Sequence, residues 1–333
     1  MCPHIWILYR IGAVGKVRGY RMKPIVSVII PTFGSNPSIA ESLDSVLSQK
    51  YDPFEVIVVD DNNPGTKERA ATETIMAKYK DEPHVRYIKH EKNKNGAAAR
   101  NTGVNAAKGA YIAFLDDDDK FLLGKLEHQV DYLEQHPEHG AVYCWRYQGD
   151  KLVSSTLDGD LSKEILDLSF TPYTSAIMMR VSCYRELNGF DESFRRHQDF
   201  EFLLRFFRKY TIGVVKEPLV EIIGNSVNNQ LQGKKAVALK KQFLSAFSNT
   251  IEELDRESSG FKKRVWAVHY SALAVNLTLK GHFILLIKSY ISDGYKGGAL
   301  FWKRYLGRLF EIFKYQFTKR RKQAPEKRES LSE

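Results

Sequence analysis

The sequence feature that most constrains the fold is a short apolar segment that runs directly into four aspartates. Residues 110–115 read AYIAFL, and Asp116, Asp117, Asp118 and Asp119 follow without a break. An apolar run of this length predicts a buried strand, so the four carboxylates leave the strand together at its carboxyl end. Like charges this close repel one another strongly at low dielectric. The run is therefore either a fully solvated surface turn or a site that a cation neutralises.

Up to about residue 140, strand patterns alternate with helix patterns. Runs rich in β-branched residues predict buried strands, and segments with an apolar face predict helices between them. The predicted strands are 25–30, 54–59, 85–88 and 110–115, and the predicted helices are 37–49, 66–80, 95–109 and 123–136. This alternation with short loops predicts an α/β fold with right-handed crossovers and a mostly parallel sheet flanked by helices.

Two other predicted strands also end in polar residues. Pro31 and Thr32 close the first strand, and Asp60 and Asp61 close the second. In parallel sheets of this kind, ligands bind beyond the carboxyl ends of the strands. Independent surface turns need not agree in this way, so the convergence favours a ligand site over a solvated acidic turn.

Beyond residue 140 the pattern becomes shorter and mixed. Residues 141–147 and 151–155 predict a hairpin, and residues 199–210 predict a helix with a buried aromatic side. We expect a basic N-terminal segment, an α/β domain, an all-helical extension and a polar tail. Their predicted bounds are 1–23, 24–225, 226–318 and 319–333.

The net charge of +10 comes from the two ends of the chain. Residues 1–23 carry five Lys and Arg and no acid, and residues 303–328 carry ten against Glu311 and Glu326. The body between them is near neutral, which argues against a nucleic-acid-binding core, and we expect no nucleic-acid partner. The basic ends are instead expected to touch an anionic surface.

Cysteine usage and hydropathy bound the compartment. Cys2, Cys144 and Cys183 lack the spacing of a disulfide framework or a zinc site, so a reducing, cytoplasmic compartment is expected. No stretch reaches the roughly 18 consecutive apolar residues that a spanning helix needs. Residues 5–10 are too short an apolar run for a signal peptide. The fold is expected to begin near Lys23, with Met22 as an alternative start of the native chain.

Several kinds of site are absent from the sequence. The first strand is followed by PTFG rather than by Gly-x-Gly-x-x-Gly, which argues against a dinucleotide site. Gly12, Gly15 and Lys16 lack P-loop spacing, no Ser sits in a nucleophile elbow, and no Cys or His cluster has metal-ligand spacing. An oxygen-only site remains, which suits Mg²⁺ or Mn²⁺ held by one or two carboxylates together with phosphate oxygens.

Five segments in order and spacing resemble family 2 glycosyltransferases with a GT-A-type fold, over residues 24–225. They are VSVIIPTF at 26–33, VIVVDD at 56–61, NGAAARN at 95–101, FLDDDD at 114–119 with KLE at 125–127, and QD at 198–199 with Arg205. The resemblance implies a nucleotide-sugar donor, expected to be a UDP-sugar, and transfer with inversion. The chain has neither Gln-x-x-Arg-Trp nor spanning helices, so transfer of a single sugar is favoured over processive synthesis.

The resemblance assigns roles around the donor. Pro31 and Thr32 would line the pocket for the base, and Asp60 or Asp61 would accept a hydrogen bond from the base or the ribose unless it only caps a helix. Arg100 would meet the diphosphate or pair with the aspartates, if it is not simply a surface residue.

The Asp-x-Asp motif of the family matches Asp116 and Asp118. Asp118 is the expected metal ligand, and Asp116 lies nearer the ribose. Asp117 is counted with the nucleotide-binding residues in a supporting role, and Asp119 is expected to cap the next helix.

Asp199 matches the general base that takes the proton from the acceptor hydroxyl. A plain helix N-cap is the alternative reading, and the two roles can coexist. The family more often has Glu before this Asp, where this chain has Gln198, so the acceptor surroundings are expected to differ. His197 is a weaker candidate for contact with the acceptor.

Residues 302–317 predict an amphipathic helix. At about 100° per residue, one arc carries aromatic and leucine side chains and the other carries Lys and Arg. The apolar arc holds Trp302, Tyr305, Leu306, Leu309, Phe310, Phe313 and Phe317, and the basic one Lys303, Arg304, Arg308 and Lys314. We expect residues 301–322 to lie on the inner face of the cell membrane, with a saccharide or lipid-linked saccharide as acceptor. The alternative is docking on the domain or on a second subunit, which would make a homo-oligomer.

Two other functions fit parts of the pattern. A nucleotidyltransferase uses a similar sheet and acidic metal site, but it needs a glycine-rich basic loop after the first strand. A non-catalytic binding protein with a degenerate transferase fold would be expected to lack Asp118 or Asp199, and this chain has both.

Overall fold

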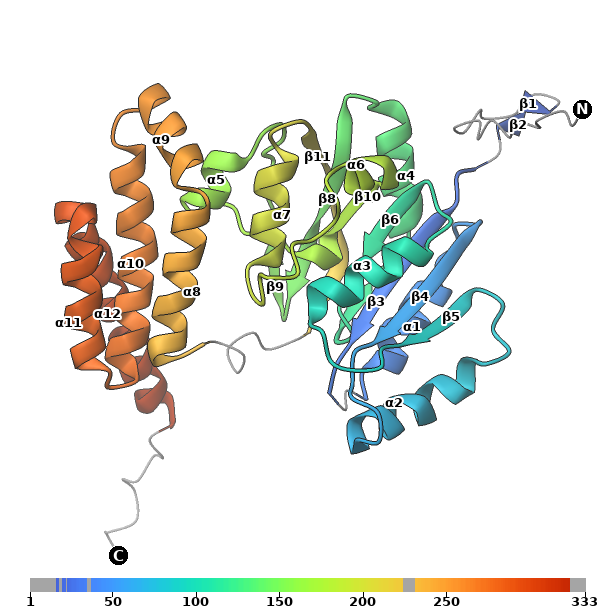
Figure 1. Ribbon diagram of the computed structural model, residues 1–333, viewed down its shortest axis with the longest axis horizontal. Coiled ribbons are helices and arrows are strands. Elements are labelled where there is room, and N and C mark those ends of the chain that lie inside the picture. The colour runs from blue at the N-terminus through green and yellow to red at the C-terminus, as the bar shows by residue number, and fades with distance from the viewer. Residues whose placement is uncertain (1–15, 18–19, 22, 35–36, 224–230, 324–333) are drawn as a thin grey trace, which may run out of the picture. The chain divides into compact units, whose positions relative to one another are not determined.

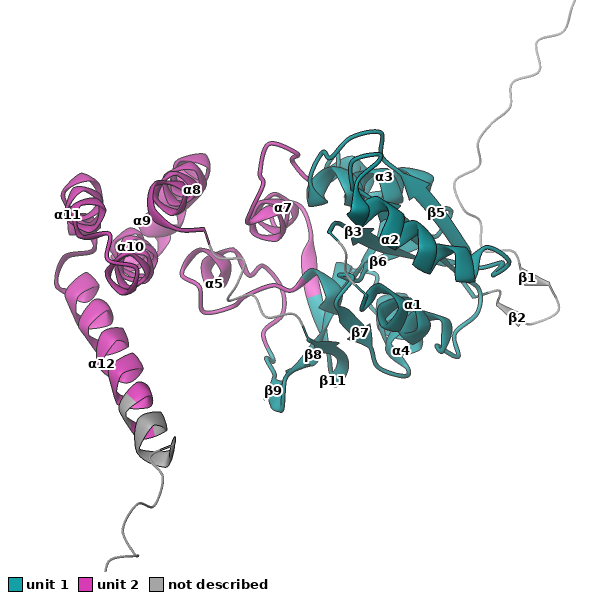
Figure 2. Cartoon of the chain, turned by 90° about the horizontal axis from the view of Figure 1, so that it is seen from below, with its two compact units in different colours: residues 1–156, 174–189, 213–223 teal, residues 157–173, 190–212, 224–333 magenta. Residues whose placement is uncertain are grey.

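The computed structural model describes residues 16–17, 20–21, 23–34, 37–223 and 231–323 (Figure 1). The chain forms two compact units that interleave along the sequence (Figure 2). Unit 1 comprises residues 1–156, 174–189 and 213–223, and unit 2 comprises residues 157–173, 190–212 and 224–333. Cys2, Met22 and the end of the predicted tail, 324–333, lie outside the described residues. The predicted domain bounds stay a prediction, because the units divide by packing rather than by continuity of the chain.

Unit 1 is built on a nine-stranded sheet with the order β5-β4-β3-β6-β10-β8-β11-β7, in which β9 pairs with β8. The strands are β3 (Val26–Thr32), β4 (Phe54–Asp60), β5 (Val85–Lys89), β6 (Tyr111–Phe114), β7 (Asp119–Phe121), β8 (His139–Gln148), β9 (Lys151–Val153), β10 (Ile177–Arg180) and β11 (Thr211–Ile222). A separate antiparallel pair, β1 (Lys16–Val17) and β2 (Tyr20–Arg21), precedes them.

The sheet is mixed rather than mostly parallel. Strands β5, β4, β3 and β6 are parallel, as the crossover pattern predicts. The antiparallel pairs are β10 with β6, β10 with β8, β11 with β7, and β8 with β9. The β8–β9 pair confirms the predicted hairpin. Both faces of β3 and β4 are buried, which explains why their sequences are continuous apolar runs rather than alternating ones.

The helices of unit 1 are α1 (Ile39–Leu47), α2 (Lys67–Met76), α3 (Gly96–Ala106), α4 (Lys125–Gln135) and α6 (Val181–Glu186). Helix α3 packs on β3 and β4, and α1 packs on β3 and β7. Figure 2 shows α3 on one side of the sheet and α1 and α4 on the other. Gly103 permits the close approach of α3, because a Cβ there would lie 2.3 Å from Cγ2 of Ile29.

Unit 2 contains the predicted all-helical extension together with two earlier helices. Its helices are α5 (Ser162–Leu166), α7 (Gln198–Phe206), α8 (Gly233–Ala246), α9 (Ser248–Glu257), α10 (Phe261–Leu279), α11 (Phe283–Ser292) and α12 (Gly298–Gln323). Helix α10 is the central one, because it packs against α8, α9, α11 and α12 and buries most of its side chains. None of the helices described is both long and apolar enough to cross a bilayer.

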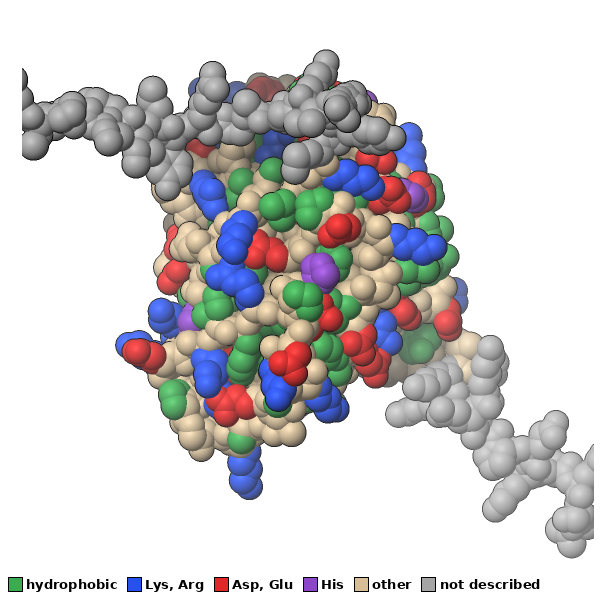
Figure 3. Space-filling model, turned by 90° about the vertical axis from the view of Figure 1, so that its right-hand side faces the viewer, with side chains coloured by type: hydrophobic (Ala, Val, Ile, Leu, Met, Phe, Trp, Pro, Cys, Tyr) green, Lys and Arg blue, Asp and Glu red, His purple; other side chains and the backbone are tan. Residues whose placement is uncertain are grey.

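The surface of the protein mixes charges of both signs. On the face drawn in Figure 3, acidic and basic side chains are interspersed with apolar ones. Of the three cysteines, Cys144 and Cys183 are buried and free. The mixed surface agrees with the near-neutral body that the charge distribution predicts.

Candidate active site

Three strand ends bring the predicted site residues of unit 1 to one edge of the sheet. Strand β3 lies between β4 and β6, and Thr32 at its end is in register with Asp60 at the end of β4. Strand β6 ends at Phe114, and the aspartate run follows at the same edge. The predicted convergence of Thr32, Asp60 and the aspartates is therefore confirmed.

Three of the four aspartates are fixed by side chains from other elements. The Thr32 hydroxyl donates to Asp117 Oδ2 at 2.5 Å, and Arg100 Nη2 of α3 donates to Asp116 Oδ1 at 2.5 Å. Asp119 Oδ2 accepts a hydrogen bond of 2.6 Å from the Ser175 hydroxyl. Of the roles expected of Arg100, the structure shows pairing with an aspartate.

Asp118 differs from its neighbours in the run. Within the part of the chain that the structure describes, no side chain hydrogen-bonds to or ion-pairs with its carboxylate, although the residue is partly buried. Burial, and then the nearby Asp116 carboxylate, raise the pKa of Asp118 above its ordinary value. An anion that the fold leaves without a compensating side chain is suited to bind a cation.

Asp119 is a structural residue of the site. It begins β7 and is only 3% exposed, and helix α4 begins six residues later after Gly124, so the predicted capping role of Asp119 is wrong. Burial, with the Asp116 charge, raises the pKa of Asp119 to about 8, so this carboxyl group holds a proton near neutral pH.

Ser175 links two of the aspartates and was not found from the sequence. Its hydroxyl accepts a hydrogen bond from the Asp116 backbone N–H at 3.1 Å while it donates to Asp119. The residue precedes β10, the strand inserted between β6 and β8. Because that insertion depends on long-range pairing, no local pattern could have indicated the contact.

Asp60 and Asp61 are buried, and both accept hydrogen bonds from other parts of unit 1. Asp60 Oδ2 accepts from the Tyr87 hydroxyl and lies 3.3 Å from Arg69 Nε, and Asp60 Oδ1 accepts from the Asn62 N–H. Asp61 accepts from the His90 ring, the Asn93 side chain and the backbone N–H groups of residues 94 and 95. The two carboxylates thus fix the loop that leads to α3 and Arg100. Their contact with a nucleotide stays a prediction.

Replacing Arg69 by Met is expected to lower the free energy of unfolding by about 3–5 kcal/mol, because it leaves the buried Asp60 carboxylate without its cation. Arg69 also donates to the carbonyl oxygens of Asn62 and His90, which would lose their partner. Urea denaturation followed by circular dichroism measures the change. The control is Lys89→Met, because the Lys89–Glu73 pair is exposed and contributes about 0–1 kcal/mol. Equal effects of the two replacements would contradict the expectation.

Lys125, from the KLE segment, lies in the core rather than at the edge. Its side chain is fully buried, with Nζ 2.5 Å from Gln129 Oε1 and 4.2 Å from the centre of the Phe121 ring. Burial lowers the pKa of Lys125 to about 8. Gln129 in turn donates to the Ala176 carbonyl, so the pair fixes α4 against the strand that carries Ser175.

Asp199 lies in unit 2, in the first turn of α7. Helix α7 begins at Gln198, one residue earlier than predicted, and the residue at its N-cap is His197. The Asp199 carboxylate accepts a hydrogen bond from the Phe200 N–H at 3.0 Å and is partly exposed. A carboxylate in the first turn is stabilised by the helix dipole. It can still accept a proton from a ligand, so its role as general base stays a prediction.

Unit 2 buries neutral imidazole and amine groups close to α7. His269 accepts a hydrogen bond from Lys240 Nζ at 2.9 Å and donates to the Leu166 carbonyl at 2.8 Å. Burial lowers the pKa of His269 well below its ordinary value, and burial lowers that of Lys240 to about 8. Burial, and then the charges of Lys240 and Arg196, lower the pKa of His197 to about 3.

The depressed pKa of His197 predicts acid sensitivity. Between pH 6.5 and about 3 the unfolded chain binds a proton at this residue and the folded chain does not, so stability falls as the pH falls. Replacing His197 by Asn is expected to flatten this part of the curve by up to about 1.4 kcal/mol per pH unit. Asn also tolerates the φ of 58° at this position. Chemical denaturation at several pH values measures the slope, and an unchanged slope would contradict the expectation.

Together, the fold and the site define an α/β protein with a cation-type acidic site at the carboxyl edge of its sheet. Residues 27–208, more than half of the chain, match the family described as "Glycosyl transferase family 2", and the chain therefore belongs to this family and is a glycosyltransferase. This confirms the predicted class of enzyme.

Relatives of the chain are named as glycosyltransferases. The "Putative teichuronic acid biosynthesis glycosyltransferase TuaG" of Bacillus subtilis is 30% identical over 272 residues, which cover 77% of this chain and 98% of TuaG. An "Uncharacterized glycosyltransferase" of Rickettsia bellii is 28% identical over 245 residues, 70% of this chain and 34% of that longer protein.

Solved structures share the fold. Staphylococcus aureus TarS 1–349 in complex with UDP-GlcNAc has a TM-score of 0.55 at 18% identity, covering 82% of this chain and 90% of that one. The mannosyltransferase PcManGT of Pyrobaculum calidifontis, in complex with GDP-Man and Mn²⁺, has a TM-score of 0.55 at 18% identity, covering 87% of this chain and 88% of that one. These likenesses confirm the predicted fold class.

Proposed function

We propose that this glycosyltransferase moves a single sugar from a nucleotide diphosphate, with UDP the expected carrier, to a hydroxyl group of a saccharide or lipid-linked saccharide, with inversion. The observation that carries the proposal is the Asp118 carboxylate, which lies at the sheet edge with a raised pKa and no partner side chain among the described residues. Its neighbours are fixed by Thr32, Arg100 and Ser175. The site is thus rigid where a metal-bound diphosphate would bind.

Each residue would have one task. Pro31, Thr32 and Asp60 or Asp61 would surround the nucleoside, with Asp116 near the ribose and Asp117 supporting through its bond to Thr32. A Mg²⁺ or Mn²⁺ ion held by Asp118 would neutralise the charge that develops on the departing diphosphate.

Arg100 lies close enough to Asp116 to exchange its ion pair for a phosphate oxygen. Asp199 would remove the proton of the acceptor hydroxyl as its oxygen attacks the anomeric carbon from the face opposite the leaving group.

The comparisons support the finer features of the proposal without fixing them. TuaG is named for teichuronic acid biosynthesis, which supports a role in the synthesis of a cell-surface polysaccharide. TarS binds UDP-GlcNAc, and PcManGT binds GDP-Man with Mn²⁺, so the fold accepts both nucleotides and a divalent ion.

One experiment tests the donor: thermal unfolding of the protein with a panel of UDP-, GDP- and dTDP-sugars, with and without Mg²⁺ or Mn²⁺. Specific binding stabilises the fold by about 2.7 kcal/mol at a hundredfold excess over Kd. We expect one nucleotide to raise the Tm only when a divalent cation is present. Absence of a metal-dependent shift across the panel would overturn the proposal.

We also propose that unit 2 rests on an anionic membrane surface. The apolar side of α12 is only partly docked: Phe301 is buried and the Tyr305 hydroxyl lies 2.8 Å from Thr278 of α10. The side chains that remain exposed on α12 are Trp302, Leu306, Phe310 and Phe313. The predicted docking alternative thus accounts for one side of the helix and leaves the other open to a bilayer. Phe317, part of the predicted face, has no described side chain.

Helix α11 extends this apolar surface, and sequence analysis missed it. Phe283, Ile284, Ile287 and Ile291 are each more than half exposed. The two helices meet where Trp302 Nε1 donates to the Tyr290 hydroxyl at 3.0 Å. Exposed apolar side chains in this number mark a surface that binds a partner or a membrane.

A cationic hollow on α12 supports an anionic occupant. The hollow has a volume of about 400 Å³ and is lined by Leu300, Lys303, Arg304, Gly307 and Arg308. The Nε of Arg304 is buried and finds no hydrogen-bond partner among the described residues. Burial, and then the Arg304 charge, lower the pKa of Arg308. The phosphate of a lipid headgroup would satisfy these groups.

Flotation with anionic phospholipid vesicles tests the membrane surface. Wild type is expected to float, whereas a variant with Ile284→Glu and Ile287→Glu is expected to bind at least about tenfold more weakly, because two charges would enter the bilayer interface. Leu123→Glu is the control, since Leu123 is 63% exposed in unit 1. Wild type that stays soluble, or a double variant that floats like wild type, would overturn this part of the proposal.

A further inference from the structure

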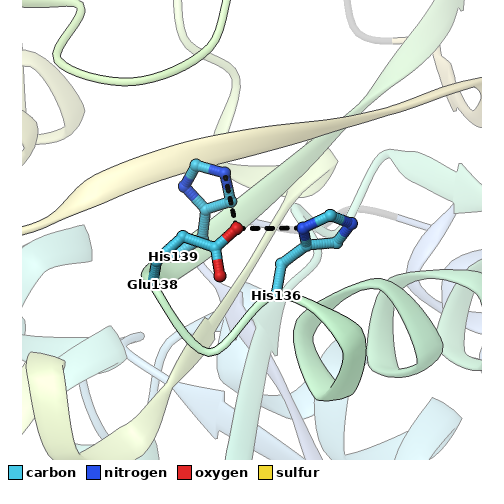
Figure 4. A group of neighbouring side chains, drawn as sticks. All are labelled: His136, Glu138 and His139. Carbon is cyan, nitrogen blue, oxygen red and sulfur yellow. Dashed lines mark hydrogen bonds and ion pairs between the residues drawn. The ribbon is translucent and has the colours of Figure 1, made fainter.

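A second group of metal-ligating side chains lies away from the aspartates, in the turn between α4 and β8. His136 follows the last residue of α4, and His139 is the first residue of β8, with Glu138 between them. Figure 4 shows the three side chains converging on one point outside the turn. Sequence analysis found no His cluster with metal-ligand spacing, because the His–Pro–Glu–His segment becomes a ligand set only when the turn folds.

The distances in this group are those of a ligand set. Nδ1 of His136 lies 3.0 Å from Oε1 of Glu138, and Nε2 of His139 lies 3.9 Å from the same oxygen. All three ligand atoms lie within 4.8 Å of one another. Ligands of a tetrahedral ion at about 2.0–2.2 Å are separated by about 3.3–3.6 Å, so small side-chain shifts would complete the set.

The backbone of the turn is held from beneath. Arg180 of β10 donates through Nη2 to the carbonyl oxygen of His136 at 3.4 Å and through Nε to that of His139 at 3.0 Å. The His139 N–H donates to the His136 carbonyl at 3.1 Å. The turn that carries the ligands is therefore fixed without help from a metal.

The two imidazole rings are also restrained. Tyr132 stacks on His136 with 4.3 Å between ring centres and lies 5.9 Å from the ring of His139. A hydrogen bond from its own backbone and the nearby His136 lower the pKa of Glu138, which favours the charged, ligating form. The exposed fractions of His136 and Glu138 are 41% and 59%, so the outer side of the site is open to water.

We propose that His136, Glu138 and His139 bind one Zn²⁺ or a similar transition-metal dication, with water in the fourth position. Two imidazoles and one carboxylate are a set that Zn²⁺ prefers, whereas the all-oxygen set at Asp118 suits Mg²⁺ or Mn²⁺. The chain would then hold two chemically distinct cation sites. The second would join the end of α4 to the start of β8, and it goes beyond the proposed transfer reaction.

Zinc titration of the untagged, EDTA-treated protein tests the site, with a chromophoric chelator as competitor and excess Mg²⁺ to occupy the aspartates. We expect one equivalent to bind and to raise the Tm. Each of His136→Gln, Glu138→Gln and His139→Gln is expected to weaken binding at least about tenfold, since even changes behind the ligands cost about 10–100-fold.

His128→Gln is the matched control. His128 forms a two-membered pair with Glu217, with Nδ1 and Oε2 also 3.0 Å apart, and no third ligand joins it among the described residues. This variant is expected to bind zinc like wild type. The proposal is overturned if wild type binds no zinc, or if the three replacements bind it as tightly as His128→Gln does.

Discussion

Asp118→Asn is expected to lower the rate of sugar transfer about a thousandfold, and removing divalent cations from the wild-type enzyme with EDTA should have the same effect. The replacement keeps the shape of the side chain and removes the charge that would hold the metal on the diphosphate. Loss of one preorganised electrostatic contact at a developing charge costs about 10²–10³ in rate, and loss of a metal costs more. Product formation at saturating donor measures the effect.

Asp119→Asn is the control for this prediction. Asp119 has the same side chain one residue away, but its pKa of about 8 means that it is already neutral near pH 7. The amide can keep the bond from Ser175, so transfer should fall by less than about tenfold. An Asp118→Asn enzyme that retains wild-type, metal-dependent transfer would show that the metal binds elsewhere.

The parallel half of the sheet could be predicted because each of its strands is a continuous apolar run buried on both faces. The antiparallel half could not, since β10 inserts between β6 and β8 through pairing over more than sixty residues of sequence. Strand β7 escaped prediction because Asp119–Phe121 is too short and too polar for a pattern.

The sequence predicted which residue types meet at the site better than how they are held there. Strand ends converge by topology, so Thr32, Asp60 and the aspartates followed from the βαβ pattern. Ser175 contributes through a bond across the sheet, and Lys125 is buried against Gln129 although Lys usually lies at the surface. Tertiary packing decided both positions, and no local propensity reports it.

The same limit applies to the two units. Residues 157–173 and 190–212, which lie within the family's sequence region, pack with the C-terminal helices. The Arg208 guanidinium donates to Thr250 of α9 at 2.6 Å, and Arg264 of α10 pairs with Asp167 at 3.2 Å. These contacts join the segment that carries Asp199 to the helices proposed to rest on the membrane. An acceptor held at the membrane surface would thus meet the unit that carries the candidate base.

Asp199→Asn is expected to lower transfer by about 10²–10⁴-fold while donor binding stays unchanged, because the amide cannot take the proton from the acceptor hydroxyl. Asp199 is in the first turn of α7, where Asn can still accept the bond from the Phe200 N–H, so folding should be preserved. Asp191→Asn is the matched control, since Asp191 is an exposed turn residue of the same unit whose Oδ1 accepts from the Ser193 N–H. Transfer assays measure the rate, and thermal shift with the nucleotide sugar measures donor binding. If Asp199→Asn and Asp191→Asn transfer sugar equally well, Asp199 is not the base; if both bind donor and neither the variants nor wild type transfers any sugar, the chain is a nucleotide-sugar-binding protein.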